Sequence, residues 1–273
     1  NSKPKFWVSQ AISLPSLIVY LTICLTLLIS PLAFAQEGDT EEVIESVTII
    51  GSAEDLKKLA GSGQIISNAD LLKAMDTDIQ KILTAVPGLY MRTEEGYGLR
   101  PNISIRGTAI ERSAKVAIME DGVLVAPSPY TSSSAYYFPT TGRIHSVEVL
   151  KGPAAVTQGP QTIGGAINLI STPIPRAPSG KLVQELGENG MMRTHAYYGG
   201  TSGNFGGLVE VHEHESDGFD SIANVGGDTG FDKSDLMVKA RYENGNHSLT
   251  LKMVDLDETS NQSYVGPVSY THL

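Results

Sequence analysis

Hydrophobic and polar positions follow two different patterns along the chain, and the change lies near residue 178. Before it, apolar residues recur every three or four positions between residues 68 and 85, which is the spacing of a helix. Asn68 is a residue type that caps helix N-termini, and Pro87 with Gly88 would end the helix. The pattern predicts one helix over part or all of residues 68–85.

Short apolar runs separated by turn residues follow this helix. Asp121-Gly122 between two such runs predicts a hairpin turn, because both residue types tolerate positive φ. A helix followed by several short strands is the pattern of a small α+β domain. The predicted strands cover residues 88–92, 102–106, 116–119, 123–125, 146–150 and 166–171.

The second part of the chain consists of longer segments whose side chains alternate in type. In the fourth of them, Leu236 and Val238 lie on the opposite face from Lys239. Tight turns alternate with a long loop over residues 216–234. Alternating strands near ten residues long, with unequal connections, are typical of a transmembrane β-barrel, whereas strands of soluble proteins are usually about 5–6 residues. The segments are 181–187, 192–200, 205–215, 235–243 and 246–256.

The N-terminal residues have the pattern of an export signal. Two lysines precede a long apolar stretch, and Ala33 and Ala35 are small residues of the kind that signal peptidase requires. This predicts a signal peptide over residues 1–35, cleaved between Ala35 and Gln36. The alternatives are an uncleaved membrane anchor, given the length of the apolar stretch, and a lipoprotein modified at Cys24.

Charge and composition exclude several classes of protein. With 20 Lys and Arg against 30 Asp and Glu, a net charge of −10 and no long basic run, we expect no nucleic-acid partner. The single cysteine excludes a disulfide framework. The chain has no phosphate-binding loop, zinc-protease helix or nucleophile elbow, so we expect no enzyme and no catalytic residues. His212 and His214 share a strand face but have no further ligands nearby, so we expect no metal site.

Three sequence blocks, taken in order, carry a resemblance to a known family. They are residues 80–89, residues 103–107 followed by 119–123, and residues 144–153 continuing through 159–168. Together they resemble the plug domain of TonB-dependent outer-membrane receptors. The resemblance implies an α+β plug domain followed by the start of a transmembrane antiparallel β-barrel, truncated in this chain. Within the family, residues 121–130 and 137–179 are similar to ferric dicitrate receptors.

The resemblance also divides the chain into parts. Two features of the sequence suggest a fragment: the first residue is Asn1 and not Met, and the last six residues read like the translation of an adapter used in preparing sequencing libraries. A genuine extracellular loop is the alternative for these six residues. The parts are a signal peptide (1–35), a TonB box and linker (36–63), the plug domain (64–178), the first strands of an incomplete barrel (179–267) and an adapter-derived tail (268–273).

An acidic segment rich in β-branched residues near the expected mature N-terminus resembles the TonB box of the family. An exposed strip of this kind can add a strand to the sheet edge of a partner. The alternatives are a second register over residues 41–44 and a first strand of the plug. The box residues would be Glu45, Ser46, Val47, Thr48 and Ile49.

Two further groups of residues take a role from the resemblance. Arg106 and Lys151 would pair with barrel carboxylates and hold the plug, although they could also be ordinary surface cations. A hydroxyl-rich stretch over residues 126–138 would form a substrate-binding apex of the plug, and a rigid connector packed on the barrel wall is the alternative. Arg100 is expected on a solvated face. The ligand-binding residues would be Tyr130, Thr131, Ser132, Tyr136 and Tyr137.

The function implied by the resemblance is that of a receptor and transporter for an iron(III) chelate, of the ferric citrate type. The expected partners are TonB with its inner-membrane energising complex, the iron chelate and outer-membrane lipid. The expected location is the outer membrane of a Gram-negative bacterium, and no cofactor is expected, because iron arrives within the substrate. The alternatives are a receptor for another siderophore, cobalamin or zinc, and a secreted β-rich binding or adhesion protein.

Overall fold

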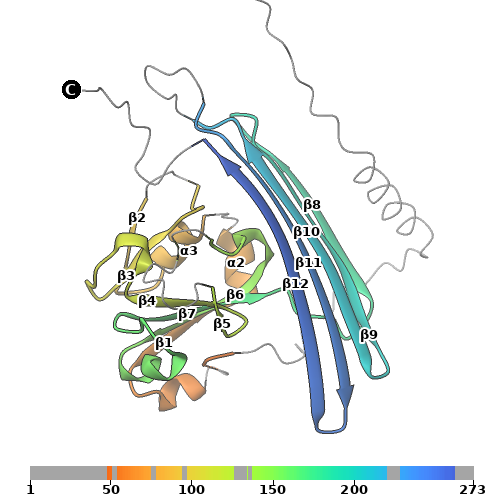
Figure 1. The fold of residues 1–273 in the computed structure, drawn as a ribbon, viewed down its shortest axis with the longest axis horizontal. Coiled ribbons are helices and arrows are strands. Elements are labelled where there is room, and N and C mark those ends of the chain that lie inside the picture. The colour runs from red at the N-terminus through yellow and green to blue at the C-terminus, as the bar shows by residue number, and fades with distance from the viewer. Residues whose placement is uncertain are drawn as a thin grey trace, which may run out of the picture. The chain divides into compact units, whose positions relative to one another are not determined.

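The computed structural model describes residues 48–50, 54–74, 78–93, 97–125, 134, 137–219 and 228–261. The described residues form two five-stranded sheets and a separate pair of strands. In Figure 1 one of the larger sheets is built from short strands and the other from long strands. We call the part before residue 178 the short-strand domain and the second sheet the long-strand sheet. Within the described residues, no helix is both long and apolar enough to cross a membrane.

The short-strand domain is an α+β unit around one sheet, as the sequence predicts. The sheet has the order β1-β6-β7-β4-β5, and β4 and β7 are parallel neighbours while the other pairs are antiparallel. Strands β2 and β3 pair separately. The elements are η1 (Asp55–Lys58), β1 (Ser62–Ile66), α2 (Asn68–Ala74), α3 (Ile79–Thr84), β2 (Leu89–Arg92), β3 (Asn102–Ile105), η2 (Glu111–Ser113), β4 (Val116–Glu120), β5 (Val123–Leu124), η3 (Thr141–Arg143), β6 (Ile144–Lys151), η4 (Pro153–Gln158) and β7 (Gly165–Ser171).

Two helices, α2 and α3, stand where one helix was predicted. Asp78 has extended backbone angles, and its side chain accepts a hydrogen bond from the Gln80 amide at 2.8 Å, so it caps α3. Ser67, and not Asn68, caps α2. The Ser67 hydroxyl accepts a hydrogen bond from the Asp70 amide, and the Asp70 carboxylate accepts one from the Ser67 amide, both at 3.2 Å. Aspartate and serine side chains compete with the backbone for its amides, which is why they divide an otherwise periodic segment.

Strand β1 lies partly in the segment that was predicted to be a linker. It pairs with β6 from Ser62 opposite Lys151 to Ile66 opposite Val147. A Cβ added at Gly63 would lie 2.6 Å from a methyl carbon of Leu56, so a larger residue there would displace the Leu56 side chain. Glycine-rich sequence suggests flexibility, but in this strand glycine allows close packing.

The core lies on both faces of the short-strand sheet. On one face Val149 and Ile167 pack in the same buried cluster as Leu83 of α3. On the other face Leu150 packs in a cluster with Ile50. Strands that are buried on both faces read as apolar runs, as residues 116–119 do, whereas β6 and β7 carry buried polar residues such as Glu148 and Asn168.

The long-strand sheet is an antiparallel meander in the order β12-β11-β10-β9-β8. All five alternating segments are strands, and each extends beyond a predicted end, β11 and β12 by four residues. Cross-strand pairing of Phe231–Ser234 with Glu213–Ser216 carries β11 into the predicted loop, because ladder hydrogen bonds outweigh the local turn preference. The strands are β8 (Ser179–Leu186), β9 (Met192–Ser202), β10 (Phe205–Ser216), β11 (Phe231–Asn244) and β12 (His247–Ser260).

The two faces of the long-strand sheet have the reverse of the usual polarity. Leu251 and Met253 are 61% and 74% exposed, whereas Lys239 and Asp235 are 8% and 1% exposed. A soluble sheet buries its apolar face. Apolar side chains outside and charged side chains inside are the arrangement of a sheet that faces lipid.

Candidate functional site between the short-strand domain and the long strands

Arg143 is the centre of a buried polar contact between the two sheets. Its guanidinium binds both carboxylate oxygens of Glu120, at the end of β4, and its Nη2–Oε2 distance is 3.2 Å. Its Nε donates to Asp235 of β11 at 2.8 Å. Thr140 donates to the same Asp235 oxygen at 2.6 Å. Arg143 therefore joins the short-strand domain to a long strand through a two-sided ion pair.

The β4–β5 hairpin supplies a second carboxylate to the same contact. Asp121 and Gly122 have φ of 48° and 76°, which are the positive angles of a two-residue hairpin turn. The turn aims the Asp121 carboxylate at Lys252 of β12, 2.6 Å away, and at Lys239 of β11, 3.7 Å away. Lys252 also binds Glu120. The predicted hairpin is confirmed, and its turn residue faces the long strands.

Charges balance within this cluster, which we call the Arg143 cluster: Arg143, Lys239 and Lys252 face Glu120, Asp121 and Asp235. Burial opposes the charge of Glu120, yet Arg143 and Lys252 hold its pKa below the ordinary value. Burial likewise opposes the charge of Asp121, and Lys239 and Lys252 lower its pKa. Both carboxylates are therefore ionised at neutral pH, and each has a cationic partner.

A second contact joins the two parts near the start of β11 and the end of β12. Arg100 binds Glu258 of β12 at 2.7 Å, and Lys233 of β11 binds the same carboxylate at 3.1 Å. The Tyr97 ring lies 4.6 Å from the Phe231 ring, centre to centre. The expectation that Arg100 is solvated is wrong: its side chain is 27% exposed and is ion-paired, because Glu258 approaches from a strand distant in sequence.

Arg106 and Lys151, the predicted contacts with barrel carboxylates, bind groups of their own domain. Arg106 donates to the Ser62 hydroxyl at 3.1 Å, and Lys151 donates to the Pro87 carbonyl at 2.9 Å. Burial, together with the charge of Arg106, lowers the pKa of Lys151. Their pairing with further barrel strands stays a prediction.

Tyr137 is the one predicted ligand residue that falls within the described part of the chain. Its hydroxyl donates to Glu120 at 3.2 Å and accepts from Arg143 at 3.3 Å. Burial raises the pKa of Tyr137. Tyr137 thus belongs to the Arg143 cluster in this structure. The other predicted ligand residues, Tyr130, Thr131, Ser132 and Tyr136, lie outside the described residues.

The predicted TonB box is described only at its end. Thr48 is exposed, and the amide of Ile49 donates to the buried carboxylate of Glu148 at 2.7 Å. Glu45, Ser46 and Val47 lie outside the described residues, as do the predicted signal peptide and its cleavage site at Ala35 and Gln36. The box assignment stays a prediction.

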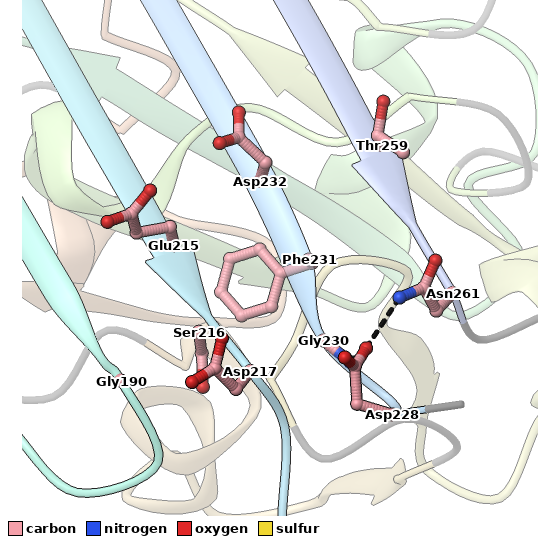
Figure 2. Close-up of a pocket in the computed structure, with 10 residues that line it drawn as sticks. All are labelled: Gly190, Glu215, Ser216, Asp217, Asp228, Gly230, Phe231, Asp232, Thr259 and Asn261. Carbon is pink, nitrogen blue, oxygen red and sulfur yellow. Dashed lines mark hydrogen bonds between the residues drawn. The ribbon is translucent and has the colours of Figure 1, made fainter. Parts of the chain in front are cut away.

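A pocket of about 330 Å³ lies at one end of strands β10, β11 and β12 (Figure 2). Its lining includes four carboxylates, from Glu215, Asp217, Asp228 and Asp232. Asp228 accepts a hydrogen bond from the Asn261 amide at 2.6 Å, which Figure 2 shows as a dashed line. This negative charge disfavours an anionic ligand in the pocket.

Sequence reasoning missed Arg143, Lys239 and Lys252 as contact residues. A usable signal was present: both lysines stand at inward positions of alternating strands in an acidic chain. Arg143 gave no such signal, because nothing in the sequence shows that Asp235 lies beside it. His212 and His214 share the inner face, as the alternation predicts, and His212 is 1% exposed.

Comparison with known proteins agrees with this architecture. Residues 55–166 match the family described as TonB-dependent Receptor Plug Domain. The chain is 31% identical over 159 residues to the iron-regulated outer membrane virulence protein of Vibrio cholerae serotype O1, covering 56% of this chain and 24% of that protein. It is 23% identical over 217 residues to the vitamin B12 transporter BtuB of Photobacterium profundum, covering 78% and 35%.

Solved structures show the same fold. The unliganded ferric citrate transporter FecA superimposes with a TM-score of 0.65 at 21% identity, over 79% of this chain and 34% of that chain. The siderophore receptor PirA from Acinetobacter baumannii gives a TM-score of 0.58 at 20% identity, over 76% and 33%. The chain therefore spans about a quarter to a third of the length of the proteins that it matches.

The fold and the buried contact define a plug domain joined to the first strands of an outer-membrane receptor barrel. Residues 55–166 belong to the plug-domain family of the TonB-dependent receptors, and the described chain has the fold of such a plug followed by the first barrel strands. The short-strand domain is accordingly the plug, and the long strands are barrel strands.

Proposed function

We propose that the chain belongs to an outer-membrane receptor that takes up an iron(III) chelate, of the ferric citrate type, with energy delivered through TonB. The observation that carries the proposal is the Arg143 cluster, in which a plug is attached to barrel strands by balanced charges. A polar contact of this kind can be separated and hydrated without exposing apolar surface. That property suits a plug that rearranges inside its barrel to let a substrate through.

The choice of an iron chelate rests on likeness alone. Among the proteins compared, one is named as iron-regulated, and the structures include a ferric citrate transporter and a siderophore receptor. The sequence resemblance over residues 121–130 and 137–179 favours ferric citrate within that group. We expect the energy-coupling segment to be the predicted box, Glu45 to Ile49.

Cobalamin is the second candidate substrate. Vitamin B12 transporters from two genera are among the relatives, and one alignment covers 78% of this chain. The plug architecture serves either substrate, so substrate choice depends on direct measurement.

Uptake by cells that lack their own receptors tests the proposal. Cells that express the receptor from its own gene should accumulate radioactive iron from ferric citrate, and should not accumulate labelled cyanocobalamin. Deleting residues 45–49 should abolish uptake while cell-surface binding of ferric citrate persists. Uptake of cobalamin but not iron would show that cobalamin is the substrate and that the iron chelate is not. Binding without any energy-dependent uptake would favour an adhesion or binding protein.

A further inference from the structure

In the segment Thr48–Ile50, which we call the N-terminal segment, two main-chain amides bind one buried carboxylate of the plug sheet, and the Ile50 side chain packs in the cluster with Leu150. The amide of Ile49 donates to Glu148 Oε2 at 2.7 Å, and the amide of Ile50 donates to Oε1 at 3.2 Å. Glu148 lies on β6 and is 1% exposed. Two successive amides on one carboxylate form a bidentate, charge-assisted contact that depends on the main chain and not on side-chain identity.

The same carboxylate is linked to the β4–β5 hairpin. Asn168 of β7 is fully buried, and its Nδ2 donates to Glu148 Oε2 at 3.0 Å. The Oδ1 of Asn168 accepts the amide of Gly122, the hairpin turn, at 2.9 Å. One side chain therefore connects the attachment of the N-terminal segment to the hairpin turn.

The hairpin in turn is attached to the barrel strands. Asp121, the neighbour of Gly122, binds Lys252 of β12 at 2.6 Å. Asp121 also accepts the Ser171 amide of β7 at 3.0 Å, so the turn is held by both the plug sheet and β12. A continuous series of contacts thus runs from Lys252 to Ile49. It passes through Asp121, Gly122, Asn168 and Glu148 by hydrogen bonds, one ion pair and one peptide bond.

We propose that Glu148 is the attachment site that holds the N-terminal segment on the plug, and that Asn168 couples this attachment to the Asp121–Lys252 contact. Loss of that contact leaves the hairpin turn held by β7 alone, so the Gly122–Asn168 bond loosens and the hold of Glu148 on the two amides weakens. The barrel strands thereby regulate how readily the segment leaves the plug. The proposal rests on the proposed function only for the identity of the segment's partner, TonB.

Chemical modification of an introduced cysteine tests the attachment. Thr48 is exposed, so Thr48→Cys reports on the segment alone in a receptor whose own cysteines, Cys24 included, are replaced by serine. In the receptor in outer-membrane vesicles, without substrate or TonB, Glu148→Gln should speed maleimide modification about tenfold, because one of the two acceptor oxygens becomes a donor. Glu54→Gln, an exposed neighbour, should change the rate less than twofold.

A second variant protects the test against misfolding of Glu148→Gln. Ile49→Pro removes one amide hydrogen from the segment. It should speed modification of the introduced cysteine more than Ile49→Ala, which shortens the same side chain at the edge of the Leu150 cluster and keeps the amide. If neither variant changes the rate by more than twofold, the attachment through Glu148 is refuted.

The coupling is tested from the barrel side. Lys252→Gln should speed modification severalfold, and should add nothing in the Glu148→Gln background, because both variants act on one attachment. Lys181→Gln, an exposed lysine of β8, is the matched control. No effect of Lys252→Gln, or an effect fully additive with Glu148→Gln, would overturn the coupling. None of these rates depends on substrate, so failure of iron uptake leaves the result interpretable.

Discussion

At the scale of single residues, the plug meets the barrel strands through charge and not through apolar packing. Arg143 is fully buried, yet it is charged, because Glu120 and Asp235 raise its pKa despite burial. A buried ion pair contributes little compared with a well-packed apolar contact, but removing one partner leaves the other charge without compensation. The Arg143 cluster therefore specifies which plug surface meets which strand.

Replacing Arg143 should destabilise the plug–strand contact strongly. Arg143→Met leaves the carboxylates of Glu120 and Asp235 close together and less well paired, and should cost about 3–5 kcal/mol. Calorimetry of the receptor in detergent should show a lower Tm. The control is Arg92→Met, which removes an exposed ion pair with Glu111 and should cost less than about 1 kcal/mol. Equal Tm values for the two variants would contradict the central role of Arg143.

The same contact should weaken in acid. The pKa of Glu120 and Asp121 lies below the ordinary values of 4.5 and 3.8, so their contribution to stability is complete above those values and is lost as pH falls through the lowered ones. Thermal stability should be flat from pH 7 to about pH 5 and decline below. Asp121→Asn should reduce this decline, and an unchanged acid profile in that variant would show that Asp121 is not responsible.

At the scale of elements, short irregular pieces of the plug make the close contacts with the strands. The turn η3 places Arg143 in its ion pairs, and it also places Gly142 against the ring of His212 on β10. A Cβ added at Gly142 would overlap that ring. The His212 ring is 1% exposed and has little room to move.

Gly142→Ala should separate η3 from β10. Overpacking at a buried contact costs about 1–3 kcal/mol, and here it should also lengthen the Arg143–Asp235 ion pair. Hydrogen exchange of the Arg143 amide, which donates to Thr140 at 3.2 Å, should become faster. Gly207→Ala is the control, because the nearest atom to its added Cβ lies 3.8 Å away and it should be tolerated. If the Arg143 amide of Gly142→Ala exchanges as slowly as that of the unsubstituted protein, the turn has accommodated the added methyl group and the prediction is wrong.

At the scale of the whole molecule, the two parts differ in what they need for stability. The plug has its own buried core on both faces of its sheet. The barrel strands expose apolar side chains such as Leu251 and Met253, and β8 and β12 are edges of their sheet in the described residues. Long apolar edges associate with other strands unless they are covered.

Limited proteolysis of residues 36–273 without lipid should therefore leave the plug and remove the strands. We expect a resistant core near residues 54–178, because η1 and β1 are packed into the plug sheet. Mass spectrometry of the surviving fragments measures its ends. Equal protection of residues 181–256 would mean that the strands fold stably without a complete barrel.

Local features of the sequence determined the elements. The period of apolar residues, the Asp121-Gly122 turn and the alternation near ten residues per segment each reflect forces between near neighbours, and they predicted the hairpin and every described strand except β1. The same rules placed one helix where there are two, because the capping bond of Asp78 competes with helical periodicity. They also interpreted Gly63 as part of a linker, although it lies in β1 with the Leu56 side chain packed against it.

Only the tertiary structure decided which charges meet. Arg143 and Asp235 are 92 residues apart, and Lys252 and Asp121 are 131 residues apart, so no local pattern relates them. Glu148 and Ile49 are joined across 99 residues in the same way. The sequence determined that inward positions of the strands are polar, because lipid excludes charge from the other face. The pairing of these inward charges with plug residues depends on how the plug packs against the strands. A buried charge is stable only beside an opposite charge, and the packing decides which one lies there.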